Sequence, residues 1–315
     1  MLILFLLALA AITALSISWY CYRICFFSPK RCRRTPFDSA DDPQFHSVAD
    51  TIFRVVSIME RYPYEDVEIR GKGGVRLRGR YYHFHDSAPL LILCHGYRST
   101  ALRDCCGGHA LSRKLGFNAL VIHQRAHGDS GGHTISFGIR ESNDIVRWAQ
   151  YAEKRFGSEI PVILFGLSMG AATVLMGCNE GYPSNVKAII ADSPYSTPAD
   201  IIKKVCRETG YPTALYPFAK LGARIFGGFD LEANTALEAV RDNRIPILFI
   251  HGEDDRLVPC GMSREIAENC LGPCRIFTVP GADHCLGCMT DPEGYEQAIR
   301  EFLSPIPDFG TESKK

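Results

Sequence analysis

Six short apolar runs recur along the chain, most of them separated by segments long enough to form a helix. The runs have the length of a β-strand and occupy residues 90–94, 119–122, 162–165, 188–191, 247–250 and 276–279. Strands of a parallel sheet are buried on both faces, so they have continuous apolar sequences instead of an alternating pattern. The recurrence of such runs between helical segments predicts an α/β fold, in which helices flank a mostly parallel central sheet.

Composition divides the chain into regions with different expected structures. We expect a transmembrane anchor, a linker, one α/β domain and a C-terminal tail, at residues 1–27, 28–45, 46–307 and 308–315. The linker is polar and contains three Pro residues, and the domain begins with a predicted helix (residues 48–61) and antiparallel hairpin (residues 67–84). The long gap between apolar runs at residues 192–245 contains helix-like pieces rich in Tyr and Phe, so we predict a helical cap insertion at approximately residues 195–240.

The N-terminal segment from Leu2 to Tyr22 contains no charged side chain. At about 1.5 Å per residue, a helix of this length crosses a hydrocarbon core of about 30 Å. Trp19 and Tyr20 stand where interfacial aromatic side chains gather. The alternative is a signal peptide, with secretion of the protein after cleavage, but a signal peptide has a basic segment before its apolar stretch and here only the α-amino group precedes it.

The charges beside this segment predict how it would cross the cell membrane. No Lys or Arg precedes it, whereas five follow closely: Arg23, Lys30, Arg31, Arg33 and Arg34. Because Lys and Arg collect on the cytoplasmic side of a membrane helix, we predict a single-pass anchor with the domain that follows it in the cytoplasm. The 13 Cys residues are scattered rather than spaced as a disulfide framework, which also favours a reducing compartment.

Charge and cysteine spacing restrict the possible ligands. Lys plus Arg and Asp plus Glu number 35 each, so there is no bulk electrostatic attraction for nucleic acid. Four cysteines that approach His284 in sequence could be read as zinc ligands, but their spacing fits no familiar zinc pattern; they are Cys270, Cys274, Cys285 and Cys288. Cys285 and Cys288 could instead form a redox-sensitive pair, although packing as free thiols is favoured. We expect no metal and no cofactor.

The pattern Gly-x-Ser-x-Gly occurs twice, around Ser168 and around Ser130. Ser168 directly follows the apolar run at residues 162–165 and precedes a segment of small and apolar residues, which is the strand-turn-helix setting of a nucleophile elbow. Ser130 lies in a loop and lacks that setting. The Gly128–Gly132 segment resembles the chymotrypsin signature, but that family is a two-barrel β protein. We therefore predict Ser168 as the nucleophile.

A nucleophilic Ser needs an imidazole to take its proton and a carboxylate to orient that imidazole. In the α/β arrangement the chain order is Ser, acid, His. Asp254 and Asp255 both follow the apolar run at 247–250, and His284 is the one His beyond them. One N–H donor for an oxyanion should come from Met169, the residue after the nucleophile, and a second from the loop after residues 90–94.

From about Tyr64 to Phe302 the chain resembles bacterial α/β-hydrolases of the serine aminopeptidase and Bem46-like group. The resemblance rests on four motifs in order: His95-Gly96-Tyr97, the run HQRAHGDSGG at residues 123–132, the nucleophile elbow and the run HGEDDRLVP at residues 251–259. It implies that Asp255 rather than Asp254 is the acid and that Tyr97 supplies the second oxyanion N–H. His123 and Ala126 depart from the family pattern, which usually has Asp and Gly there, so altered loop packing is expected.

Three functions remain open on the sequence. The leading hypothesis is a serine hydrolase that cleaves carboxylic esters through an acyl-enzyme, with Ser168, Asp255 and His284 as its triad. The alternatives are a serine peptidase that uses the same triad on peptide substrates, and a non-catalytic scaffold tethered to the membrane. Aromatic residues in the expected cap indicate an apolar acyl pocket, although such residues more often pack together; they are Tyr195, Tyr211, Tyr216, Phe218, Phe226 and Phe229.

Overall fold

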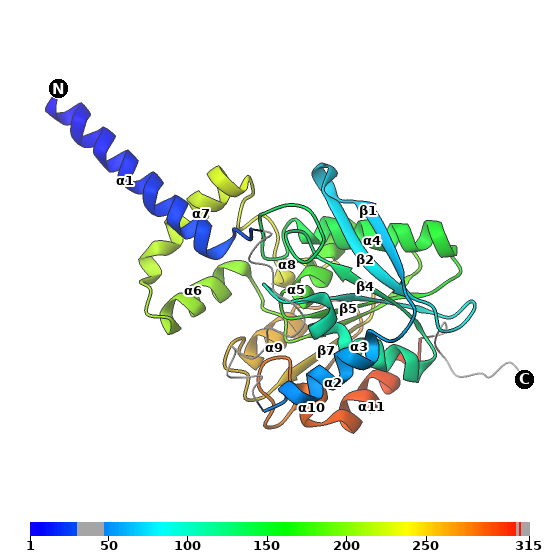
Figure 1. The fold of residues 1–315 in the computed structure, drawn as a ribbon. Coiled ribbons are helices and arrows are strands. Elements are labelled where there is room, and N and C mark those ends of the chain that lie inside the picture. The colour runs from blue at the N-terminus through cyan, green and yellow to red at the C-terminus, as the bar shows by residue number, and fades with distance from the viewer. Residues whose placement is uncertain (30–46, 307–308, 310–315) are drawn as a thin grey trace, which may run out of the picture.

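One central sheet organises the domain. In the computed structural model, which describes residues 1–29, 47–306 and 309, eight strands form this sheet in the order β1-β2-β4-β3-β5-β6-β7-β8 (Figure 1). β2 is antiparallel to both of its neighbours, and all other neighbouring strands are parallel. The strands are β1 (Glu65–Arg70), β2 (Arg76–Tyr82), β3 (Leu90–Cys94), β4 (Asn118–His123), β5 (Val162–Leu167), β6 (Val186–Asp192), β7 (Ile247–Gly252) and β8 (Cys274–Val279).

The strand predictions are confirmed, with one difference in burial. Each of the six apolar runs lies within a strand, and the hairpin expected at residues 67–84 is formed by β1 and β2, with β1 beginning two residues earlier, at Glu65. β8, however, is an edge strand, and Ile276 on its outer face is 38% exposed. An apolar run is therefore not sufficient to place a strand in the interior of this sheet. Most of the expected linker (residues 28–45) and tail (residues 308–315) lies outside the described residues.

Helices cover both faces of the sheet because alternate strand residues point to opposite sides. Leu91 and Leu93 face one layer, which contains α2 (Ala49–Met59), α3 (Ala101–Leu115), α10 (Gly287–Thr290) and α11 (Pro292–Leu303). Leu90 and Ile92 face the other layer, which contains α4 (Glu141–Phe156), α5 (Met169–Met176), α8 (Ala236–Ala239) and α9 (Cys260–Glu268). The result is a three-layer α/β/α domain (Figure 1).

The part of the chain between β6 and α8 forms a separate helical layer at one end of the domain. It contains α6 (Pro198–Glu208), α7 (Tyr216–Gly222) and the π-helical turn η7 (Ala223–Gly227). Short 3-10 helices occur at η4 (Lys72–Gly74), η5 (Gly177–Glu180) and η6 (Thr213–Leu215). α6 and α7 lie beside the C-terminal end of the N-terminal helix, away from α2 and α11 (Figure 1).

The N-terminal helix α1 (Leu2–Cys25) projects from the body of the molecule (Figure 1). It is the one helix in the described residues that is long and apolar enough to cross a membrane. Residues 2–13 are exposed along their whole length. Apolar side chains in such numbers are costly to leave in water, so this part of α1 has the character of a membrane-embedded segment.

The last turns of α1, by contrast, belong to the core of the domain. The ring of Phe26 is fully buried and makes edge-to-face contacts with Phe137 and Phe229 at centroid distances of 5.7 and 5.4 Å. α1 also approaches α7 so closely that a Cβ atom on Gly222 would lie 2.2 Å from the carbonyl oxygen of Ser18. Only Gly fits there. The C-terminal end of α1 is thus packed into the domain, a contact that the sequence patterns did not predict.

Candidate active site

Ser168 occupies the tight turn between β5 and α5. Its backbone has φ 54° and ψ −117°, a conformation that non-Gly residues rarely adopt. A Cβ atom on Gly166 would lie 2.2 Å from the carbonyl oxygen of Gly170, and one on Gly170 would lie 2.1 Å from that of Cys94. The two glycines are therefore required for the turn to close against the neighbouring strand and helix. The Ser168 N–H, held by the carbonyl oxygen of Asp192 at 2.8 Å, completes the turn.

The structure brings Ser168, His284 and Asp255 into one hydrogen-bonded chain. Ser168 Oγ lies 2.8 Å from His284 Nε2, and His284 Nδ1 lies 2.7 Å from Asp255 Oδ2. Because a carboxylate only accepts, Nδ1 carries the proton and donates to Asp255, which leaves Nε2 free to accept from the Ser168 hydroxyl. His284 and Asp255 are 4% and 7% exposed, so water does not compete strongly for these bonds.

Asp255 is held at the carboxyl end of β7 by several donors. The N–H groups of Leu257 and Val258 donate to Oδ1 at 3.0 and 2.7 Å. Burial alone would raise the pKa of the Asp255 carboxyl, but hydrogen bonds from His251 and His284 outweigh it and hold this pKa well below its usual range. The carboxylate therefore stays ionised, as the orienting acid of a triad must.

Two supporting residues were missed by the sequence analysis. His251 Nε2 lies 3.1 Å from Asp255 Oδ2 and 2.8 Å from the carbonyl oxygen of Val258, so a second imidazole contacts the acid. Asp283 accepts the N–H of His284 at 2.8 Å and that of Arg256 at 3.0 Å, which ties the acid loop to the histidine loop. His251 opens the motif at residues 251–259 and Asp283 directly precedes His284, but a linear pattern does not show which loops meet.

The two expected oxyanion donors lie at the start of α5 and in the loop after β3. Met169 begins α5, and the first N–H groups of a helix have no intrahelical partner and carry partial positive charge. In the loop after β3, Gly96 N–H donates to Asp104 Oδ2 at 2.8 Å and Arg98 N–H to His127 Nε2 at 3.0 Å. Tyr97 lies between Gly96 and Arg98 in the sequence, so the backbone on both sides of it is held by a hydrogen bond. A Cβ atom on Gly96 would lie 3.4 Å from that of Ser168, which brings the loop against the nucleophile.

His95 has a structural position in this loop. Its Nδ1 donates to the carbonyl oxygen of Gly96 at 2.8 Å, and its Nε2 accepts the N–H of Gln124 at 3.1 Å. Burial lowers the pKa of the His95 imidazole, which therefore stays neutral in this tautomer. The ring joins the loop after β3 to the end of β4, so it shapes the turn without reaching the reacting atoms.

The rival site residues lie elsewhere or have other partners. Ser130 is fully buried in its loop, where its hydroxyl donates to the carbonyl oxygen of His123 at 2.6 Å and accepts the N–H of Arg78 at 2.9 Å. Asp254 is exposed to solvent. No three His, Cys, Asp or Glu side chains in the described part of the chain are arranged to hold a metal ion, so nothing supports the zinc interpretation of the cysteines.

The cysteines near His284 are partly buried free thiols. Cys285 has φ 55°, and its Sγ lies 3.7 Å from His284 Nε2. Burial, followed by the nearby Asp192 carboxylate, raises the pKa of the Cys285 thiol well above its usual range, so this sulfur is protonated and a poor nucleophile. Cys285 and Cys288 are both free in the structure, and their proposed redox pairing remains a prediction.

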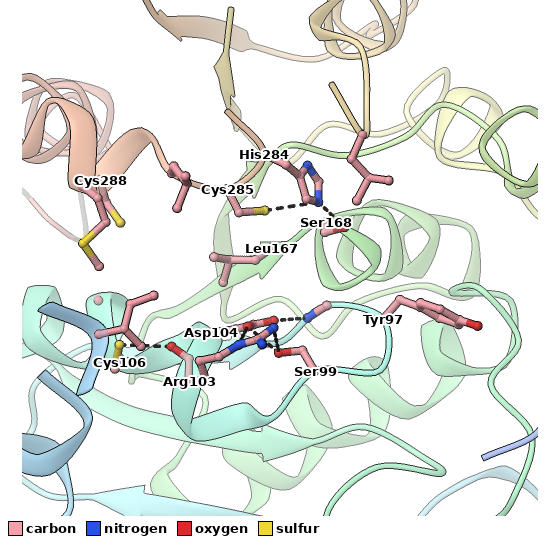
Figure 2. Close-up of a pocket in the computed structure, with 16 residues that line it drawn as sticks. Tyr97, Ser99, Arg103, Asp104, Cys106, Leu167, Ser168, His284, Cys285 and Cys288 are labelled. Atoms are coloured by element: carbon pink, nitrogen blue, oxygen red, sulfur yellow. Dashed lines mark hydrogen bonds and ion pairs between the residues drawn. The ribbon is translucent and has the colours of Figure 1, made fainter. Parts of the chain in front are cut away.

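Ser168 lies between two cavities. One of about 160 Å³ has Ser168 and His284 on one side and Arg103 and Asp104 across from them (Figure 2). The other, of about 330 Å³, is enclosed by α1, α6 and α7 and is lined almost entirely by apolar and aromatic side chains. Tyr97 borders both. The arrangement offers an acyl group and a leaving group separate spaces on either side of the nucleophile.

Comparison with known proteins supports the assignment of the fold. The family model described as the alpha/beta hydrolase fold matches residues 89–207. The uncharacterized protein YqkD of Bacillus subtilis is 26% identical over 237 residues, which cover 75% of this chain and 77% of YqkD. Protein bem46 of Schizosaccharomyces pombe is 22% identical over 256 residues, covering 76% of this chain and 77% of bem46.

Among solved structures, the esterase Pf2001 of Pyrococcus furiosus has a similar fold. The TM-score is 0.66 at 24% sequence identity, and the match covers 80% of this chain and 93% of the esterase. The eight-stranded, mostly parallel sheet and its flanking helices agree with this likeness in fold. The chain therefore has the α/β-hydrolase fold.

Proposed function

We propose that the protein is a serine hydrolase that cleaves carboxylic esters through an acyl-enzyme. The observation that carries this proposal is the continuous chain of hydrogen bonds from Asp255 through His284 to Ser168. Ser168 stands on a strained turn at the mouth of two cavities, and a scaffold protein has no need of such an arrangement. A non-catalytic tether is therefore the weaker hypothesis.

In the first half of the reaction, Ser168 Oγ forms a bond to the ester carbonyl carbon while His284 Nε2 takes the hydroxyl proton. The carbonyl electron pair moves onto oxygen, and the N–H groups of Met169 and Tyr97 stabilise this oxyanion. The carbonyl then re-forms, the bond to the alcohol oxygen breaks, and His284 returns its proton to that oxygen. The products are a free alcohol and an acyl group on Ser168.

In the second half, water takes the place of the alcohol. His284 Nε2 removes a proton from the water, whose oxygen bonds to the acyl carbon. Collapse of the second tetrahedral intermediate breaks the bond to Ser168 Oγ, which regains the proton from His284, and a carboxylic acid leaves. Asp255 stays ionised throughout and stabilises the imidazolium that forms twice in each cycle.

A serine peptidase would use the same triad, so the substrate-binding surfaces must distinguish the two. An aminopeptidase needs a carboxylate to receive the amino terminus of its substrate. Among the described residues that line the two cavities, Asp104 is the one carboxylate. It already accepts from Gly96, Ser99 and Arg103. The larger cavity is apolar, which favours the acyl part of an ester over a peptide.

We further propose that α1 holds the enzyme in the cell membrane as a single-pass anchor. Cleavage as a signal peptide would remove Phe26 and Tyr22 from the core of the domain and leave their apolar partners exposed. Retention of α1 is therefore favoured by packing. Five basic residues follow its apolar segment, which supports a cytoplasmic position for the hydrolase domain.

Hydrolysis of an aryl acetate tests the proposed reaction. Wild-type protein should release the phenol, and Ser168→Ala should lower turnover by several orders of magnitude because the nucleophile is lost. Ser130→Ala is the matched control, since it removes the other Ser of a Gly-x-Ser-x-Gly pattern; turnover per folded molecule should be nearly unchanged. Equal loss in both variants, or none in either, would contradict the proposal.

A further inference from the structure

The larger cavity beside Ser168 has one wall that comes from α1. Tyr20, Cys21, Ile24 and Cys25 of that helix line it, and α6 faces them across the cavity. Its volume of about 330 Å³ lies within the range of roughly 300–1,000 Å³ typical of small-ligand sites. A membrane helix that only tethered the enzyme would not need to line a cavity that contains the nucleophile. The helix is therefore positioned to contact whatever acyl group Ser168 attacks.

We propose that this cavity binds the acyl chain of an ester that has a single long chain and enters directly from the membrane. The C-terminal end of α1 then forms part of the acyl-binding site. The inference rests on the proposed esterase function and adds the substrate class and its source. Its chemistry is simple: an unbranched alkyl chain fills an apolar cavity, and the ester carbonyl at its end reaches Ser168.

The expected position of the cavity along the membrane normal suits an ester of this kind. α1 has 24 residues, so it is about 36 Å long, against a hydrocarbon core of about 30 Å. If residues near Leu2 lie at one surface, the segment from Tyr20 to Cys25 lies at the other, where headgroups meet acyl chains. The cavity wall is thus at the level at which membrane lipids carry their ester bonds.

The helical layer of α6, α7 and η7 also exposes apolar side chains beside the C-terminal end of α1. Leu221, Ile225 and Phe226 follow one another along α7 and η7, beside α1, and are 37%, 49% and 38% exposed. The ring of Phe226 lies 6.0 Å from that of Tyr22 on α1. Exposed apolar groups gathered next to a membrane helix are stabilised when they enter the interface. Together with α1 they would seat the cavity against the bilayer.

The test compares a long and a short ester on full-length protein in phosphatidylcholine vesicles. The probes are p-nitrophenyl palmitate and p-nitrophenyl acetate, and the readout is the ratio of their kcat/KM values. Cys21→Trp fills the cavity from α1 and Cys206→Trp fills it from α6. Each should lower the palmitate-to-acetate ratio by roughly tenfold or more, because methylenes excluded from the cavity stay in water. Ile12→Trp, on the exposed part of α1, is the matched control and should leave the ratio unchanged.

Two further measurements do not depend on the variants. Wild-type protein should hydrolyse palmitate ester placed in its own vesicles faster than the same ester supplied in separate, protein-free vesicles. It should also react faster with hexadecyl than with ethyl fluorophosphonate. A soluble source of substrate would make the two vesicle arrangements equal, and an acyl chain bound elsewhere would remove the preference for the hexadecyl probe.

The outcomes separate this inference from the proposed function. Protein that hydrolyses acetate ester and reacts with ethyl fluorophosphonate, but keeps its palmitate-to-acetate ratio in the folded cavity variants, is an esterase whose acyl site lies elsewhere. Protein that hydrolyses neither ester and reacts with neither fluorophosphonate contradicts the esterase proposal itself.

Discussion

The side chain of Tyr97 is hydrogen-bonded to the backbone of Cys25, because its hydroxyl donates to the Cys25 carbonyl oxygen at 2.7 Å. The next residue, Arg98, donates from Nη2 to the carbonyl oxygens of Ile24 and Phe27 at 2.5 and 3.2 Å. The last carbonyl groups of a helix lack intrahelical partners and carry partial negative charge, which favours a cation there. Three hydrogen bonds therefore join the end of the apolar helix to the loop expected to bind the oxyanion.

Removal of the Tyr97 hydroxyl should disturb catalysis more than substrate binding. In Tyr97→Phe the ring still lines both cavities, but the loop loses one bond to α1, so its N–H is less well positioned for the transition state. We expect kcat for an aryl ester to fall several-fold with little change in KM, and the free energy of unfolding to fall by about 1 kcal/mol.

Tyr182→Phe is the matched control for this variant. The Tyr182 hydroxyl donates to the carbonyl oxygen of Val174 at 2.7 Å, a bond of the same kind away from the catalytic loops. It should lower stability to a similar extent without affecting kcat. If Tyr97→Phe changes the free energy of unfolding alone, the hydroxyl has no positioning role.

These bonds illustrate which features the sequence can predict. Six of the strands could be predicted because each contains a continuous apolar run, and the proximity of Ser168 and His284 because each follows such a run in the required order. The bond from Tyr97 to Cys25 joins residues 72 positions apart. Nothing in the local pattern indicates it, because it depends on how α1 packs against the folded domain. The contact of His251 with Asp255 was missed for a related reason, since it depends on which ring faces the carboxylate after the loop has closed.

The acid of the proposed triad can be located by comparing two neighbouring substitutions. Asp255→Asn removes the charge that stabilises the imidazolium and should lower kcat by roughly 10³–10⁴-fold. Asp254→Asn changes an exposed side chain and should have little effect. Steady-state rates with an aryl ester give the ranking, and the opposite order would move the acid by one residue.

Asp255 should also make stability depend on pH in the acid range. Hydrogen bonds from His251 and His284 hold the folded-state pKa of this carboxyl well below the unfolded value of about 3.9. The unfolded state therefore binds a proton first as the pH falls, so the contribution is complete above that value and is lost as the pH approaches the folded pKa. Urea unfolding from about pH 5 to pH 2 should show a shallower loss in Asp255→Asn than in wild type. Parallel curves would indicate that Asp255 does not contribute to acid unfolding.

The orientation of the anchor can be tested with thiol labelling in cells. The basic residues after α1 predict that the domain faces the cytoplasm. Glu159→Cys places a thiol in an exposed loop between α4 and β5, and a membrane-impermeant maleimide should label it only after lysis. Labelling of intact cells would place the domain outside and overturn the predicted topology.

The most direct test of the account is covalent labelling with ethyl fluorophosphonate, followed by identification of the modified residue by mass spectrometry. Only a hydroxyl activated by a neighbouring base reacts rapidly with this reagent. The geometry of Ser168 and His284 predicts a single phosphonylated peptide carrying the adduct on Ser168, with labelling abolished in Ser168→Ala and strongly reduced in His284→Ala. Folded wild-type protein that remains unlabelled, or that carries the adduct on Ser130, would contradict the assignment of Ser168 as the catalytic nucleophile.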